Sequence, residues 1–334
     1  MVIDIGVQEK SQLDSWQQAI VEELRSKKVL PVVSNRLHND LLLGGHDQLV
    51  RSYAKYVRYP FDCRMKLYEI TQYCMIMEKQ GKSRPERIVK RRYLDAVKKI
   101  LLAFTQMNDS AGTRESLLEE ELAQFNEHDF STMAADLDYL SLTEDKQNPL
   151  LILADFNLPV YLTTSYHCFL EQALMKLGKK PHTAVCCWND QITPSAKEND
   201  LFAQDYQPDP MNPLVYHLYG LDRYPESLVL TEDDYFTFLV NTSRDRDRIA
   251  NCINAPLNNY SLMLFGYDLA DWDFRILLQG LIKNRSFPSQ SVCALQLQPS
   301  EEEKIYLDRY MKEVDFKVFW GDFGEYLLQI NTVT

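Results

Sequence analysis

The strongest constraint on the fold is a regular alternation of apolar runs and helix-patterned segments in the second half of the chain. Short runs of apolar and β-branched residues lie at 158–164, 213–220, 260–268, 291–297 and 316–321. Segments with helical spacing of apolar residues lie between them, at 166–177, 232–240, 271–284 and 300–312. Strands that alternate with helices predict a parallel sheet covered by helices on both faces.

The first half of the chain adds one strand and a helical module. The run VLPVV at 29–33 follows a helix-patterned segment at 15–27 and brings the expected number of strands to about six. We therefore predict an α/β fold, Rossmann-like and doubly wound, with a mostly parallel sheet. Its expected parts are the N-terminal helix and first strand at 1–44, a helical insertion at 45–149, and the remainder of the α/β domain at 150–334.

Composition narrows the classes of function. The 334 residues are 45% hydrophobic and 25% charged, as in an ordinary globular protein, and the net charge is −12. This acidic balance argues against nucleic-acid binding. One basic run, KSRPERIVKRRY at 82–93, has two interpretations that stay open: a solvated helix start or a phosphate-binding patch.

Location and thiol chemistry follow from the same reading. No apolar run approaches the ~18 residues that span a bilayer, and the N-terminus lacks a signal pattern. The seven cysteines form no CxxC pair, and Cys186 and Cys187 are adjacent. We expect a cytoplasmic protein with reduced thiols, no membrane contact and no bound metal.

Polar residues gather where the expected strands end. In open α/β sheets, ligands bind at the carboxyl ends of the strands. This rule selects Ser-Asn-Arg at 34–36, Ser-Tyr-His at 165–167, the end of VYHLYG at 215–220, and GYDLADWD at 266–273. A ligand site is therefore expected at one edge of the sheet.

In this order and spacing, these places resemble the sirtuin-like domains of bacterial anti-phage defence proteins. The resemblance covers about residues 16–36 and 150–328, and it is strongest in VYLTTSYHCFLEQAL, PLVYHLYGLDRYPESLVLTEDDYFTFLV and LMLFGYDLADWDFRILLQGL. It implies a Rossmann-like sheet with an inserted helical module that binds NAD; active members cleave the nicotinamide–ribose bond. By analogy it also implies a homo-oligomer and a second protein of the same defence system as partner.

The resemblance assigns NAD binding to Ser34, Asn35, Thr164, Tyr219, Gly266, Tyr267 and Asp268. Several positions depart from the family's pattern. Val33, Ser34 and Asn35 stand where the family has Gly-Ala-Gly, whose small residues let the backbone approach phosphates. Tyr219 stands at the position of the family's catalytic histidine, and Asp268 replaces a small hydroxyl residue.

Two further departures concern the ribose end of the site. Ser165 and His167 replace the family's Asn and Asp, and His217 lies two residues before Tyr219, about 6.6 Å further back along the strand. One interpretation is a rebuilt pocket, in which His217 or His167 is the base and Ser165 positions the water that attacks C1′ of the ribose. The other is a catalytically degenerate scaffold or nucleotide sensor. The residues that bind the phosphates, the residue that binds the ribose and the catalytic base all stabilise the same transition state, so changes at all three would leave little activity.

The same residues also have structural interpretations. Histidines at strand ends are often only hydrogen-bonded, and Ser165 is well placed to cap the helix expected at 166–177. Thr231 and Asp271 are expected helix N-caps, and Asp273 in a first helical turn complements the helix dipole.

Overall fold

A computed structural model gives the arrangement of the chain. It describes residues 18, 20–43, 45–63, 65–79, 84–108, 130–136, 148–192, 206–245, 248–249, 251–268, 271–282, 291–294, 300–312 and 316–319.

The described strands form one parallel sheet of seven, in the order β3-β4-β2-β1-β5-β6-β7. They are β1 (Val29–Val33), β2 (Val160–Thr163), β3 (His182–Val185), β4 (Leu214–His217), β5 (Ser261–Phe265), β6 (Ser291–Ala294) and β7 (Phe316–Phe319). All six expected strands form, and the α/β fold class is confirmed. The seventh, β3, was missed because HTAV is short, carries two polar residues and forms the edge of the sheet.

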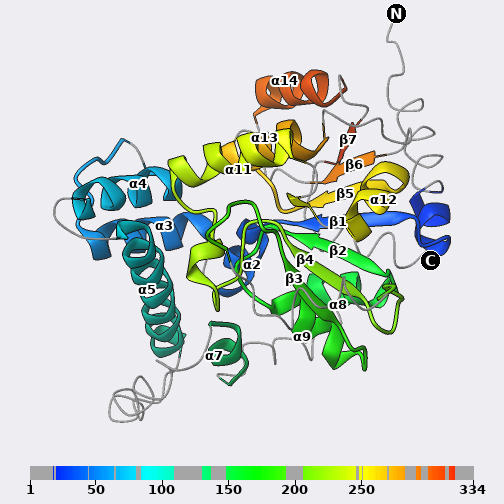
Figure 1. Cartoon of the computed structure of the whole chain (residues 1–334), viewed down its shortest axis with the longest axis horizontal. Helices are drawn as coiled ribbons and strands as arrows, with labels where there is room; N and C mark the ends of the chain where they lie inside the picture. The colour runs from blue at the N-terminus through cyan, green and yellow to red at the C-terminus, as the bar shows by residue number, and fades with distance from the viewer. Residues whose placement is uncertain are drawn as a thin grey trace, which may run out of the picture.

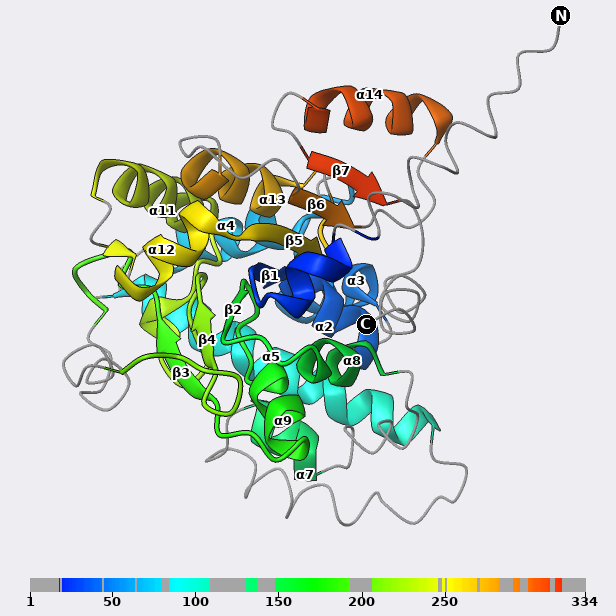
Figure 2. The same ribbon diagram turned by 90° about the vertical axis from the view of Figure 1, so that its right-hand side faces the viewer.

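Helices flank the sheet on both faces. They are α2 (Asn35–Leu42), α3 (His46–Val57), α4 (Leu67–Glu78), α5 (Pro85–Asn108), α7 (Phe130–Asp136), α8 (Pro149–Asp155), α9 (Phe169–Lys176), α11 (Glu232–Arg244), α12 (Asn251–Asn259), α13 (Trp272–Leu277) and α14 (Glu301–Lys312), with a 3-10 turn η3 (Pro225–Ser227) and a π-helical turn η5 (Leu278–Ile282). Figures 1 and 2 show α11, α13 and α14 on one face and α8 and α9 on the other. None of the helices in the described ranges is long and apolar enough to cross a membrane.

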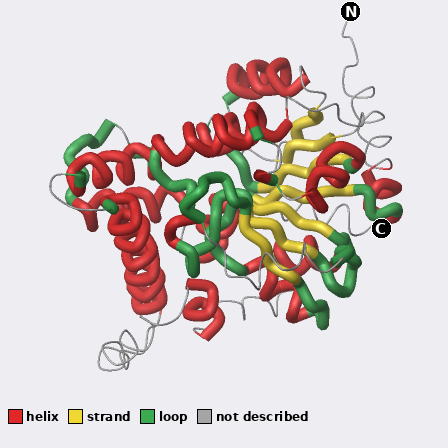
Figure 3. The backbone as a smooth tube through the Cα atoms, viewed as in Figure 1, coloured by secondary structure: helices red, strands yellow, loops and turns green. Residues whose placement is uncertain are grey.

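The first strand lies in the middle of the sheet. Val33 of β1 pairs with Thr163 of β2 on one side and with Phe265 of β5 on the other. Strands β1, β2, β4 and β5 are buried along their whole length, and Figure 3 shows the strands as one continuous block between helices. A sheet buried on both faces explains why these runs are continuously apolar instead of alternating.

Helices α3, α4 and α5 pack together beside the sheet (Figure 1). Side chains from α4 and α5 reach segments that follow strand ends. Thr71 of α4 donates a hydrogen bond to the carbonyl of Leu230, and Lys90 of α5 pairs with Asp234 of α11. The helical module therefore adjoins the edge of the sheet where ligands were expected, while the three-part division of the chain stays a prediction.

Candidate functional site

The expected phosphate cradle after β1 is occupied by the protein's own hydroxyl groups. Ser34 is the N-cap of α2: its Oγ accepts a hydrogen bond from the amide of Leu37 at 3.1 Å and donates one to the carbonyl of Gly266 at 2.5 Å. The amide of Asn35 donates to Oγ1 of Thr164 at 3.3 Å. The amides that an active relative would turn to the pyrophosphate are already bonded within the fold.

Gly266 serves packing at this point. Its φ of +73° lies in the left-handed region, and an added Cβ would lie 2.6 Å from Cβ of Leu37 and 2.7 Å from Oγ of Ser34. The end of β5 therefore presses directly against the first turn of α2, and the space that a glycine leaves is filled by the protein.

Tyr219 cannot replace the histidine of active relatives as a base. Its hydroxyl donates to the carbonyl of Asp273 at 2.8 Å, and burial raises its pKa well above the ordinary value, so it stays a neutral phenol. Tyr267 is also buried, and its hydroxyl shares a hydrogen bond of 3.1 Å with Oγ1 of Thr164. Both residues lie at the expected place, with their polar atoms bonded internally.

His217 is fully buried between two acceptors. Its Nδ1 lies 2.8 Å from the carbonyl of Ser165 and its Nε2 lies 2.8 Å from Oε1 of Glu171, which also accepts a hydrogen bond from Thr183. Burial alone lowers the pKa of His217, but the Glu171 carboxylate and the Ser165 carbonyl outweigh it, and the pKa ends above its ordinary value. When both ring nitrogens of His217 carry a proton and donate it to these two acceptors, the ring has no nitrogen left that could accept a proton from a substrate.

His167 turns to a different carboxylate. Its Nδ1 lies 2.9 Å from Oδ2 of Asp222, which also accepts a hydrogen bond from the amide of Phe130, and both side chains of the pair are buried. The ring packs 4.3 Å from that of Phe130, measured between centroids. His167 therefore ties α7 to the loops at the strand ends.

Ser165 joins the two histidines without capping a helix. Its carbonyl binds the ring of His217, and its Oγ accepts a hydrogen bond from the amide of His167 at 3.2 Å. The expectation that Ser165 caps the next helix is wrong, because α9 begins at Phe169 after Cys168. The intervening residues form a turn that these hydrogen bonds close.

Two further groups in this buried region were missed by the sequence reading. His38 of α2 stacks on Phe169, and burial, with the nearby His167 and His217, lowers its pKa to about 3. The sulfur of Cys168 and the ligand atoms of Glu171 and His217 lie within 4.8 Å of one another. That trio has the donor types of a zinc site, but the imidazole and carboxylate already bond to each other.

The space left for a ligand at the strand ends is about 40 Å³. It is lined by Asn35, Arg36, His46, Lys66, Leu67, Tyr68, Thr164, Tyr166, Tyr219, Tyr235, Asp271 and Asp273. A buried water needs roughly 10–15 Å³ of such volume, so this cavity has room for about three waters. Sites for drug-sized ligands span about 300–1,000 Å³.

A network of ion pairs closes one side of this cavity. Arg36 lies 3.4 Å from Asp268 and 3.4 Å from Asp271, and Lys66 also pairs with Asp271. Asp268, expected to hold ribose hydroxyls, faces a guanidinium instead. Asp271 is the N-cap residue of α13, as expected, but its carboxylate pairs with these cations and makes no capping hydrogen bond. At Thr231 the expected cap is confirmed, with a capping box to Asp234.

Two polar groups that line the cavity remain chemically available. Oδ1 of Asn35 is buried and has no hydrogen-bond partner. Burial, followed by the negative charges of Asp271 and Asp268, raises the pKa of Asp273 to about 7. The sequence reading assigned Asp273 only to the helix dipole; three carboxylates within six residues of GYDLADWD were the signal for a raised pKa.

Sheet topology and strand-end site define the class: a Rossmann-like α/β protein whose ligand-binding edge is closed by its own side chains. Within that class, residues 159–317 match the family model of the SIR2-like domain, so the chain contains a SIR2-like domain. The expected sirtuin-like resemblance is confirmed over this range. No curated protein was found to match the chain.

The SIR2-like family implies NAD as a ligand by resemblance. The residues present do not fit NAD in this arrangement, because the cavity is too small and the amides of α2 and the carboxylate of Asp268 are taken.

Proposed function

We propose that this chain is a catalytically degenerate sirtuin-like subunit that serves a cytoplasmic, prokaryotic anti-phage assembly as a scaffold or sensor. The anti-phage setting rests on the resemblance of the sequence motifs. Loss of catalysis is supported by one observation: the cavity at the strand ends, where the resemblance expects NAD, has a volume of about 40 Å³.

The energetic argument supports loss of hydrolysis. Removing one donor that stabilises a transition state already costs about 10²–10³ in rate. Here the phosphate-binding amides are capped by Ser34 and Thr164, and the base position holds the neutral phenol of Tyr219. The histidines proposed as substitutes, His167 and His217, are each held by a buried carboxylate.

The test is calorimetric titration of the purified chain with NAD, combined with chromatographic detection of nicotinamide over several hours. The proposal expects no heat of binding at millimolar NAD and no nicotinamide above a protein-free control. Nicotinamide released by the wild-type chain in proportion to its concentration would overturn it.

A second candidate, a divergent NAD hydrolase that opens before it acts, is favoured by Asn35 and Asp273. Both line the cavity; one offers a free acceptor, and the other has a pKa suited to proton transfer near neutral pH. Opening would break the Arg36 ion pairs, and that side chain is part-exposed. This candidate predicts nicotinamide release that disappears in Asp273→Asn, an exchange of nearly equal shape.

The scaffold role also carries a prediction about assembly. We propose that the chain associates with itself and with a second protein of the same defence system, as sirtuin-like relatives do. Sedimentation velocity at 1–50 μM is expected to show a species heavier than the 39.0 kDa chain. A single monomeric species over that range would contradict self-association.

A further inference from the structure

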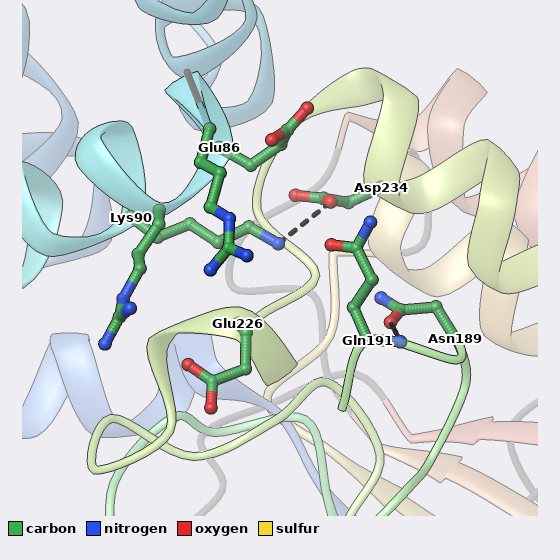
Figure 4. Close-up of a pocket in the computed structure, with 8 residues that line it drawn as sticks. Glu86, Lys90, Asn189, Gln191, Glu226 and Asp234 are labelled. Atoms are coloured by element: carbon green, nitrogen blue, oxygen red, sulfur yellow. Dashed lines mark hydrogen bonds and ion pairs between the residues drawn. The ribbon is translucent and has the colours of Figure 1, made fainter. Parts of the chain in front are cut away.

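A second, larger pocket lies between the helical module and the α/β domain. Its volume is about 600 Å³, and it is lined by Arg84, Glu86, Arg87, Lys90, Asn189, Gln191, Glu226 and Asp234 (Figure 4). These residues come from the start of α5, the segment after β3, the turn η3 and the first turn of α11. The pocket shares no lining residue with the closed cavity described above.

A buried ammonium group lies in the wall of this pocket. Lys90 is 2% exposed; its Nζ lies 2.9 Å from Oδ1 of Asp234 and 5.4 Å from the centroid of the Trp188 ring. An ammonium carries three N–H donors, and among the described residues Asp234 is the one hydrogen-bond acceptor of Lys90. Oδ2 of Asp234 is itself bound by the amides of Leu230 and Thr231. The pair is therefore fixed, and the ammonium keeps donor capacity for a ligand.

Two guanidinium groups lie on the same side of the pocket. Arg84 directly precedes α5, and Arg87 lies one turn before Lys90 on the same helix face. Neither is ion-paired with a carboxylate in the part of the chain that the structure describes. Because Asp234 neutralises Lys90, the positive charge on this side of the pocket comes from the two arginines. The carboxylate of Glu86 beside them offsets part of that charge. Arginine forks match the geometry of phosphate oxygens.

The facing wall has a different chemistry. Asn189, Gln191 and Glu226 line it; Figure 4 shows Asn189 and Gln191 on one side, with Oδ1 of Asn189 accepting a hydrogen bond from the Gln191 backbone amide at 2.8 Å, and Glu226 below them. Side-chain amides both donate and accept, and a carboxylate accepts hydrogen bonds from hydroxyl groups. Glu226 would repel a ligand that is anionic throughout. The pocket therefore suits a molecule with an anionic group at one end and hydroxyl groups at the other.

We propose that this pocket binds a small phosphorylated polyhydroxy compound, a sugar phosphate or a nucleotide. Its phosphate contacts Arg84, Arg87 and the free donors of Lys90, and its hydroxyl groups contact Glu226 and the amides of Asn189 and Gln191. The basic run at 82–93 then acts as a phosphate-binding patch. This binding is separate from the fate of NAD at the closed cavity and holds whether or not the chain hydrolyses NAD.

The test is calorimetric titration of the full chain with ribose 5-phosphate and with AMP, each beside its unphosphorylated counterpart, ribose or adenosine. We expect at least one phosphorylated probe to bind and its counterpart to bind at least tenfold more weakly. Preference for AMP assigns a nucleotide site, and equal binding of both assigns recognition of the sugar phosphate. Absence of binding by both phosphorylated probes at 10 mM would overturn the proposal.

Variants locate the binding. Arg87→Gln is expected to weaken the bound probe about tenfold to a hundredfold, because it removes a charge-assisted hydrogen bond. Arg91→Gln is the matched control: it makes the same change at another exposed residue of the same helix, outside the pocket, and should leave affinity unchanged. Glu226→Gln should weaken the sugar-bearing probe but not inorganic phosphate. Equal loss in Arg87→Gln and Arg91→Gln would show non-specific attraction and refute the assigned site.

Discussion

The buried pair of His217 and Glu171 allows a quantitative test of the proposal that the polar residues at the strand ends have a structural role. The change is Glu171→Ala, which removes the carboxylate 2.8 Å from Nε2 of His217 and also the acceptor of the Thr183 hydroxyl. At this distance, two unit charges attract by roughly 6 kcal/mol at an effective dielectric constant of about 20. Breaking buried pairs by removing one partner costs about 3–5 kcal/mol, which is the loss in unfolding free energy expected here.

The pH dependence gives an independent signature. Because the pKa of His217 is raised in the folded protein, its contribution to stability is fully present below the ordinary value of 6.5 and is lost as the pH rises through the folded pKa. The wild-type chain should therefore lose stability above pH 6.5. Glu171→Ala should lack that decline. Once the carboxylate is removed, the burial of His217 favours its neutral form.

Urea unfolding at pH 6 and pH 8.5, followed by the fluorescence of the four tryptophans, measures both effects. The control is Asp190→Ala, which breaks the exposed pair of Asp190 and Arg248 and should change stability far less. A Glu171→Ala variant no less stable than Asp190→Ala, with the wild-type pH dependence, would refute the structural account of His217.

Other variants test other parts of the fold. Gly266→Ala should lower the free energy of unfolding in urea by more than about 2 kcal/mol, because the strain of a left-handed backbone adds to the clash with α2. Gly178→Ala, with φ of +77° and nothing within 4 Å, should lower it by about 1 kcal/mol. Equal losses in the two variants would contradict the close approach of α2 to Gly266. Lys90→Met should lose about 3–5 kcal/mol by leaving Asp234 buried and unpaired, and a loss below 1 kcal/mol would show that the pair is solvated. In thermal melts, Asp273→Asn should become more stable relative to wild type as the pH rises from 4 to 8. The wild type loses stability over that range because the pKa of Asp273 is raised to about 7 in the folded protein, and the variant has no carboxyl group to titrate. Parallel stability curves for the two proteins would contradict the raised pKa.

The placement of site residues at one edge could be predicted because it depends on topology. Ser34, Thr164 and Gly266 follow three neighbouring parallel strands, so they had to meet, and they do. The strand β3 could not be found in the same way. Its HTAV run lacks the continuous apolar pattern of the central strands, since an edge strand is covered less completely.

The pairing of charges could not be predicted. Arg36 and Asp268 are 232 residues apart, and nothing local in either segment indicates that they bind each other. Glu171 lies in the first turn of α9, where an acidic residue is common in any helix, and α9 and β4 place it against His217. Pairs of this kind depend on distances between elements that sequence periodicity does not contain.

From the sequence alone, a parallel α/β sheet, a helical insertion and a polar edge at the strand ends could be predicted. The spacing of apolar residues and the order of strands and helices are both properties of the sequence itself. Whether that edge is an open ligand site was decided only by tertiary structure. Polar side chains at the strand ends can face a ligand or one another, and which they do depends on how closely α2, α4 and α13 pack. Here they face one another, and the open, charged pocket lies instead beside α5.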